Sequence, residues 1–199
     1  MNIENHKYHH GNLRDEILSA AYNFVLENGY AAMSLRSIAE NCNVSATAIY
    51  RHYKTKEHLL ADVVVKGFIE FNLFVEGDSE ANIFDKCDNY LEFAFDNKNI
   101  YDLLFSQSVV EFLQFPKILE VADNSFQTLL ESVKEHDRSL NDLSASNKAI
   151  HIWSFLHGIS SISKKMDVAL SLPDSEMPIP VRSVKRARSN LRQFIEDLF

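Results

Sequence analysis

Side chains that can contact nucleic-acid bases project together from a short predicted helix that begins at Ala46. Ile49 and Tyr53 lie one helical turn apart, so we expect them to share the buried face. The outward-facing side chains are then Ala46, Thr47, Tyr50 and Arg51. An arginine fork suits the O6 and N7 atoms of guanine, whereas alanine and threonine methyl groups suit the methyl of thymine. The spacing therefore predicts a helix face able to read base edges.

A second short helix precedes this one across a tight polar joint. Leu35, Ile38 and Ala39 recur at helical spacing and form one buried stripe. The joint contains Asn43, which tolerates a left-handed backbone, and Ser45, which suits the cap of the following helix. Two short helices around a turn of roughly three to four residues are typical of a helix-turn-helix, whose second helix can enter a DNA major groove.

Composition indicates an ordinary globular chain of 199 residues, of which 46% are hydrophobic. We expect a cytoplasmic protein and no membrane partner, because no run approaches the roughly 18 apolar residues that span a bilayer. Cys42 and Cys87 lack metal-ligand spacing and are expected to be small core residues. His6, His9 and His10 favour a flexible arm near DNA over a metal site, because no carboxylate or cysteine completes a ligand set.

The charge of the chain is divided unevenly. Residues 1–58 contain equal numbers of acidic and basic residues, so the remainder carries the whole net charge of −8. Arg51, Lys54 and Lys56 cluster in the neutral part. Only this part is expected to approach phosphates, since the acidic part would be repelled by them.

The hydrophobic periodicity predicts an all-α fold of about nine helices, with no strand and no internal repeat. The helices are expected near Asn12–Asn28, from Leu35, from Ala46, and at Lys56–Glu76, Glu80–Phe95, Asn99–Ser106, Lys117–Glu135, Asn141–Asp167 and Ser183–Phe199. Thr55 is expected to cap the helix from Lys56, whose amino-terminal end could bind a phosphate. No nucleophile elbow, phosphate-binding glycine loop or HExxH motif is present, so we expect neither an enzyme nor a cofactor.

Ser34–Leu59 resembles the DNA-binding signature of TetR-family transcriptional regulators. The matching segments are Leu35-Arg36-Ser37-Ile38-Ala39, Asn43-Val44-Ser45, Ile49-Tyr50-Arg51-His52-Tyr53 and Lys56-Glu57-His58-Leu59. Tyr8–Arg14, Tyr101–Phe105 and Trp153–Gly158 are similar to the subgroup with a WHG-type C-terminal domain, although that tripeptide is not contiguous here. The resemblance implies a helix-turn-helix domain at residues 1–55, an effector-binding and dimerisation domain at residues 56–199, and a homodimer formed chiefly by the last two long helices.

The resemblance also assigns roles to individual residues. Ser45 and Thr47 match the start of the family's recognition helix, Tyr50 and His52 match phosphate-side positions, and Lys56 matches the lysine that opens the fourth helix. The alternative for Tyr50 and His52 is surface packing. Base reading is then left largely to Ala46, Thr47, Arg51 and Arg36, which favours a near-palindromic, A·T-leaning double-stranded operator read partly through DNA shape.

Aromatic residues in the C-terminal part could line a mostly apolar ligand pocket, or could simply form the core. The candidate pocket residues are Phe93, Tyr101, Phe105, Phe112, Phe126, His151, Trp153 and His157. The resemblance implies a small apolar or amphipathic ligand that releases a repressor from its operator. The alternative is a helix-turn-helix regulator without small-molecule input, which is constitutive or controlled by a protein partner.

Two apolar faces are candidates for the dimer contact. Leu156, Ile159, Ser160 and Ser163 form one beside Trp153, and the second is formed by Phe194, Ile195, Leu198 and Phe199. Either face could instead be ordinary core.

Overall fold

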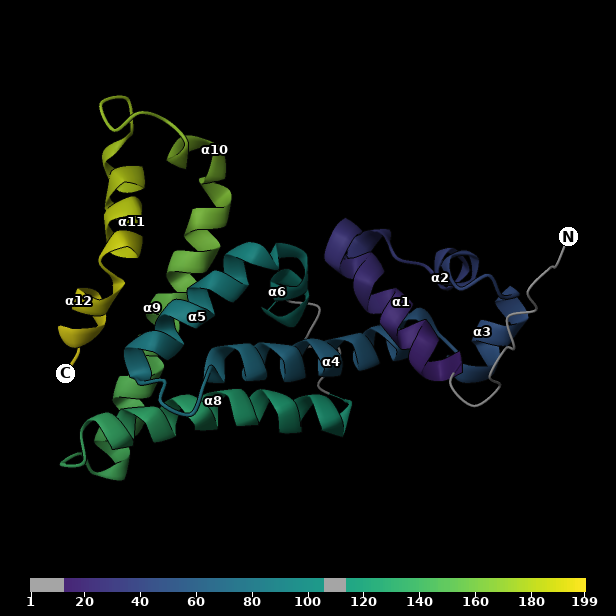
Figure 1. Ribbon diagram of the computed structural model, residues 1–199, viewed down its shortest axis with the longest axis horizontal. Helices are drawn as coiled ribbons and strands as arrows, with labels where there is room; N and C mark the ends of the chain where they lie inside the picture. Colours follow the sequence, from purple (N-terminus) through teal and green to yellow (C-terminus); the bar gives the residue numbers. More distant parts are fainter. Residues whose placement is uncertain (1–12, 106–113) are drawn as a thin grey trace, which may run out of the picture. The chain divides into compact units, whose positions relative to one another are not determined.

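The structure is a computed structural model that describes residues 13–105 and 114–199 (Figure 1). Within these ranges the regular elements are eleven α-helices and one 3-10 helix, and no strand occurs. The all-α prediction is confirmed. His6, His9, His10 and Phe112 lie outside the described residues. None of the described helices is long and apolar enough to cross a membrane.

The chain divides into two compact units. The first comprises Met1–Gly67 and Asn99–Ile118, and the second comprises Phe68–Lys98 and Leu119–Phe199. The long helix α4 (Lys56–Glu76) therefore contributes to both units. The proposed functional boundary between residues 55 and 56 remains a prediction.

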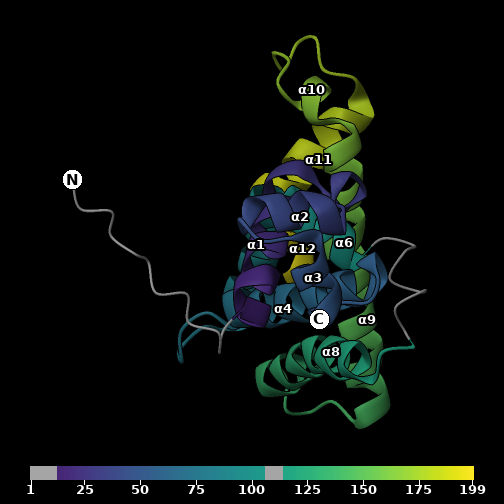
Figure 2. The ribbon, with the colours of Figure 1, turned by 90° about the vertical axis from the view of Figure 1, so that its right-hand side faces the viewer.

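The first unit is built on α1 (Leu13–Asn28), η1 (Tyr30–Ala32), α2 (Leu35–Asn41) and α3 (Ala46–His52), with α6 (Lys98–Phe105) packed on the first half of α4. The helices α1, α2 and α3 lie together in both views (Figures 1 and 2). Ile17, Val25, Ile38, Ile49 and Leu59 are fully buried and form the core of this unit.

Close packing joins α6 to its neighbours in the first unit. A Cβ atom placed on Gly67 would lie 3.0 Å from Leu104 Cδ2 and 3.3 Å from Ile100 Cγ2, so only glycine fits without movement. The Asn99 side chain donates a 2.9 Å hydrogen bond to the carbonyl of Leu26, near the carboxyl end of α1. Gly29 then ends this helix with a φ of 78°.

The second unit contains α5 (Ile83–Asp96), α8 (Pro116–His136), α9 (Asp142–Lys165), α10 (Asp167–Leu170), α11 (Ile179–Ser189) and α12 (Leu191–Glu196). Here α5 packs on α9 and α12, while α11 packs on α9 and α10. Leu156, Ile159, Ser160 and Ser163 are buried within this single chain, as is Ile195. The structure therefore assigns these residues, left open by the sequence, to the core.

The largest departures from the expected helices lie in the C-terminal part of the chain. The last predicted helix is interrupted at Asn190, whose φ of −128° and ψ of 35° lie outside the helical range. Its first part begins earlier than expected, at Ile179, because Pro180 is accommodated in the first turn, where its missing N–H is harmless. The short helix α10 follows α9 directly and is not distinguishable by periodicity.

Candidate nucleic-acid interface and the C-terminal cavities

The joint between α2 and α3 is fixed by local capping. Asn43 adopts a positive φ of 54°, as expected for an asparagine in a left-handed position. Ser34 caps α2 in a reciprocal box with Ser37, and the Ser45 hydroxyl accepts a 3.2 Å hydrogen bond from the Ala48 N–H. These hydrogen bonds satisfy amide groups that a helix start leaves free, so both short helices begin at defined residues.

The two faces of α3 are clearly distinguished by burial. Ile49 is 0% exposed and Tyr53 is 2% exposed, whereas Tyr50 is 56% exposed. The other exposed residues of the helix and its cap are Ser45, Ala46, Thr47, Arg51 and His52. The structure thus presents all the predicted recognition-helix residues to solvent on one short helix. Their contacts with DNA remain predictions.

A partly buried hydrogen-bond cluster holds the carboxyl end of α3. The Tyr53 hydroxyl donates to Asp62 Oδ2 at 2.9 Å, and Arg14 Nη2 donates to the same oxygen at 2.9 Å. Burial, assisted by the charge of Asp62, raises the pKa of Tyr53 to about 12. The cluster links α1, α3 and α4, and sequence reasoning missed it. Its only signal was one carboxylate, Asp62, within the otherwise apolar run at residues 59–65 of α4.

At the start of α4, where a phosphate contact remains a prediction, the structure shows local capping by the chain's own side chains. Hydrogen bonds from its own backbone N–H and from Thr55 lower the pKa of Glu57, so a carboxylate already occupies the positive end of the helix. His58 Nδ1 lies 3.0 Å from the Thr55 hydroxyl and takes the place of the usual glutamate of a capping box. Lys56 Nζ donates a long, 3.4 Å hydrogen bond to the carbonyl of Ala31.

Arg36 lies on the exposed side of α2. Its Nε atom is 3.5 Å from Glu40 Oε1, one turn further along the helix, and both side chains are largely exposed. Such a surface pair contributes little stability, so the guanidinium can exchange its partner at small cost.

The candidate pocket residues form separate groups. Phe93 is buried against Phe71 and Phe74, with ring centroids at 5.2 and 5.7 Å. Tyr101 packs on Phe105 in the first unit, with centroids at 4.7 Å. On α9, Trp153 stacks on His157 at 5.6 Å, and partial burial lowers the pKa of this histidine. The remaining described candidates are the half-buried Phe126 and the exposed His151.

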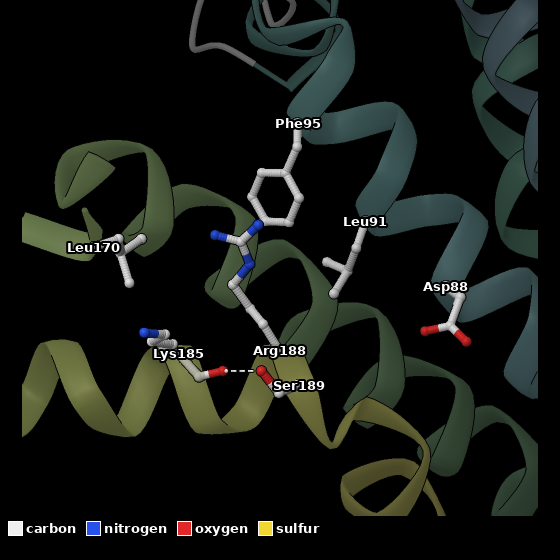
Figure 3. Close-up of a pocket in the computed structure, with 7 residues that line it drawn as sticks. All are labelled: Asp88, Leu91, Phe95, Leu170, Lys185, Arg188 and Ser189. Carbon is white, nitrogen blue, oxygen red and sulfur yellow. Dashed lines mark hydrogen bonds between the residues drawn. The ribbon is translucent and has the colours of Figure 1, made fainter. Parts of the chain in front are cut away.

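Two neighbouring cavities open in the second unit, and none of the described candidates lines either. The larger, of about 420 Å³, lies between α5, α10 and α11 (Figure 3). Its lining residues are Asp88, Leu91, Phe95, Leu170, Lys185, Arg188 and Ser189. The smaller, of about 210 Å³, shares Phe95 and Arg188 and adds Lys98, Ser163, Lys164 and Asp167. The pocket roles of the predicted residues remain untested predictions.

Comparison with known proteins identifies both parts of the chain. Residues 17–63 match the family described as bacterial regulatory proteins, tetR family, and residues 83–176 match the tetracyclin repressor-like C-terminal domain. No curated protein gives a significant match.

Solved structures with a similar fold share little sequence with this chain. A protein with unknown function from Rhodococcus sp. RHA1 aligns with a TM-score of 0.71 and 20% identity, over 97% of this chain and 98% of that chain. The regulator FadR from Bacillus subtilis, in complex with stearoyl-CoA, gives 0.61 and 20% over 88% and 97%. BioQ with its double-stranded DNA operator gives 0.60 and 14% over 93% and 96%.

The family matches and the helix-turn-helix define this protein as a DNA-binding transcriptional regulator. Since the two matches cover the helix-turn-helix and most of the C-terminal helices, the chain belongs to the TetR family.

Proposed function

We propose that the protein is a repressor that binds a near-palindromic operator as a homodimer and leaves it when a small molecule binds its C-terminal helices. The observation that carries the proposal is the exposed face of α3, held from behind by Ile49 and Tyr53. A helix that packs on its domain through one face and exposes the other can enter the major groove, which is wide enough for one helix.

The contacts divide into two kinds. Ser45, Tyr50, His52 and Lys56 position the protein on phosphates, and such contacts carry little sequence information. Base reading falls to Ala46, Thr47 and Arg51 on α3, with Arg36 on α2. Two of these four side chains, Ala46 and Thr47, offer methyl groups, which favours thymine-containing half-sites and a contribution from DNA shape.

The exposed side of α9 supports the homodimer. Leu143 is 72% exposed and Ile150 is 40% exposed, although both are large and apolar. Trp153 and His157 lie at the edge of the same side, opposite the buried residues of this helix. An apolar stripe of this kind is typical of a surface covered by a second copy. Two-fold symmetry would place the two α3 helices roughly 34–36 Å apart, or a multiple of that distance, on the operator.

Small-molecule control is supported by the C-terminal family match and by the cavities of the second unit. FadR, one protein of similar fold, was solved with stearoyl-CoA bound. A ligand releases DNA only through a higher affinity for the DNA-incompetent dimer than for the competent one.

The test is to map the DNA that the protein occupies in cells, and then to measure the affinity of the purified protein for the recovered sites. We expect short near-palindromic sites beside a small set of genes, and a lower affinity when a ligand is added. Occupancy without any common sequence would contradict operator binding. Ligands that bind the protein but leave its DNA affinity unchanged would contradict the release mechanism.

A further inference from the structure

Among the residues that the structure describes, none forms a hydrogen bond or ion pair with the charge of Arg188. Its guanidinium carbon lies 3.8 Å from the centroid of the Phe95 ring, as in a cation–π contact. In the described part of the chain, Arg188 makes this contact and is attracted electrostatically by Asp167. No acceptor there receives a hydrogen bond from its N–H groups. Arg188 is half-buried, and this burial lowers the pKa of its guanidinium. A half-buried guanidinium normally has an acceptor partner.

The charged neighbours of Arg188 are already paired with one another. Lys185 Nζ lies 2.7 Å from Asp174, and Lys98 Nζ lies 2.7 Å from Asp167. Figure 3 places Asp88 further along α5, beyond Leu91 and away from the guanidinium. These pairs leave Arg188 as the cation in the larger cavity with N–H groups available to a ligand.

The smaller cavity provides a second, independent observation. Ser163 is 2% exposed, and its hydroxyl has no hydrogen-bond partner within the described ranges. This side chain lines the same cavity as Lys98, Lys164 and Arg188. A buried hydroxyl without a partner is costly, so a polar ligand group that reached Ser163 after a small shift of the cavity wall would gain a hydrogen bond there.

The wall of the larger cavity is suited to an apolar group. Leu91 and Phe95 from α5 and Leu170 from α10 surround the end of the Arg188 side chain (Figure 3). Ser189 is not available as a strong donor, because its hydroxyl donates a 3.1 Å hydrogen bond to the carbonyl of Lys185. The volume of about 420 Å³ falls within the range of small-molecule sites.

We propose that these adjoining cavities bind a small amphipathic organic anion, whose carboxylate or phosphate pairs with Arg188 while its apolar part lies along Leu91, Phe95 and Leu170. The planar guanidinium can bind such a group through two parallel hydrogen bonds. The lining cations are Lys98, Lys164, Lys185 and Arg188, and they still outnumber the carboxylates Asp88 and Asp167 when Asp174, the partner of Lys185, is added. In an acidic part of the chain, this local excess of cations would concentrate an anion at one place.

The test is calorimetric titration of the full-length protein with decanoate, decyl phosphate and decan-1-ol. The alcohol has the same apolar chain without the charge. We expect the two anions to bind about 10- to 100-fold more tightly than the alcohol, as for a charge-assisted hydrogen-bonded pair. The preference of either headgroup over the other distinguishes a carboxylate ligand from a phosphate ligand. If the wild-type protein binds the alcohol as tightly as the anions, or binds none of the three, the proposal is overturned.

Variants locate the site. Arg188→Gln should reduce anion affinity about 10- to 100-fold, and Arg188→Lys should recover part of it, because the charge returns without the planar fork. Arg186→Gln is the matched control, since Arg186 is exposed on the same helix and lines neither cavity. Unchanged affinity in Arg188→Gln, or an equal loss in Arg186→Gln, would overturn the assignment.

Sedimentation of the same variants shows whether Arg188 binds a ligand or instead contacts a second copy of the chain. Arg188→Gln should keep the oligomeric state of the wild type; a shift to monomer with unchanged anion binding would overturn the proposal. The inference rests on the proposed function only in expecting a small-molecule ligand in the C-terminal helices. Because binding is measured without DNA, its failure would leave operator binding standing, and failed operator binding would leave the calorimetry unaffected.

Discussion

The Tyr53 hydroxyl donates a 2.9 Å hydrogen bond to Asp62, and this contact fastens the end of α3 to α4. Arg14 donates to the same carboxylate oxygen from α1. The contact explains how a helix as short as α3 (Ala46–His52) keeps its orientation, since so few residues form an unstable helix in isolation. The buried side of α3 is therefore tied to two longer helices, and its other side is exposed.

Removal of this hydroxyl should weaken the helix-turn-helix without changing its exposed face. We expect Tyr53→Phe to lower the free energy of unfolding by about 1 kcal/mol, since Asp62 keeps its partner Arg14. Urea denaturation provides the measurement. Tyr50→Phe is the control, because Tyr50 is exposed and its loss should change stability little. Equal stability of both variants would show that the Tyr53 contact is not needed.

The Tyr53 hydroxyl should lose its proton at a higher pH than an ordinary tyrosine. Its pKa of about 12 in the folded protein lies above the ordinary value, so the folded state retains the proton longer than the unfolded state. Stability from this group is fully present below about pH 10, the ordinary tyrosine pKa, and is lost as the pH rises through the folded value. Ultraviolet titration of the wild type against Tyr53→Phe should show one phenol fewer ionising near pH 12 in the variant. A difference near pH 10 would contradict the buried hydrogen bond.

His157 should make the protein less stable in mild acid. Burial lowers its pKa, so the neutral ring is favoured in the folded state. Its contribution is present above the unfolded value of about 6.5 and is lost as the pH falls through the lower folded value. As the pH falls below about 6.5, we expect the thermal midpoint of His157→Gln to decrease less than that of the wild type. His151→Gln, an exposed site on the same helix, should follow the wild type; the reverse result would refute the assignment.

The exposed stripe of α9 should carry the dimer contact. Ile150→Glu would place a charge on this stripe, and we expect dimer dissociation to become at least about tenfold easier, because an unpaired charge would be desolvated. Sedimentation over a concentration series measures the dissociation constant. The control is Val168→Glu, at an 86% exposed position on α10. Monomerisation by the control variant, but not by Ile150→Glu, would place the contact elsewhere.

Features determined by neighbouring residues could be predicted from the sequence. The α2–α3 joint depends on Asn43 and Ser45, whose backbone and capping preferences act over a few residues. The division of α3 into a buried and an exposed face follows from helical periodicity alone. Periodicity does not reveal that the Glu57 carboxylate accepts hydrogen bonds at the start of α4, and the phosphate contact expected there stays a prediction.

Features that depend on distant residues were not predictable in this way. Arg14 and Asp62 are separated by 48 positions, and no local pattern pairs them. The burial of Leu156 and Ile159, rather than of Leu143 and Ile150, depends on which neighbour packs on α9. The cavity around Arg188 likewise needs α5, α10 and α11 together, and no pattern within a single helix predicts that they meet.

The central claim is that the exposed face of α3 reads DNA sequence. Its most direct test is selection of bound duplexes from a random library by the wild type, Thr47→Ala and Arg51→Ala, with Arg138→Ala as a control at an exposed residue of the second unit. We predict a near-palindromic, A·T-leaning site for the wild type and the control, and altered base preferences at defined positions for the two α3 variants. The same preferences in all four proteins would contradict the account.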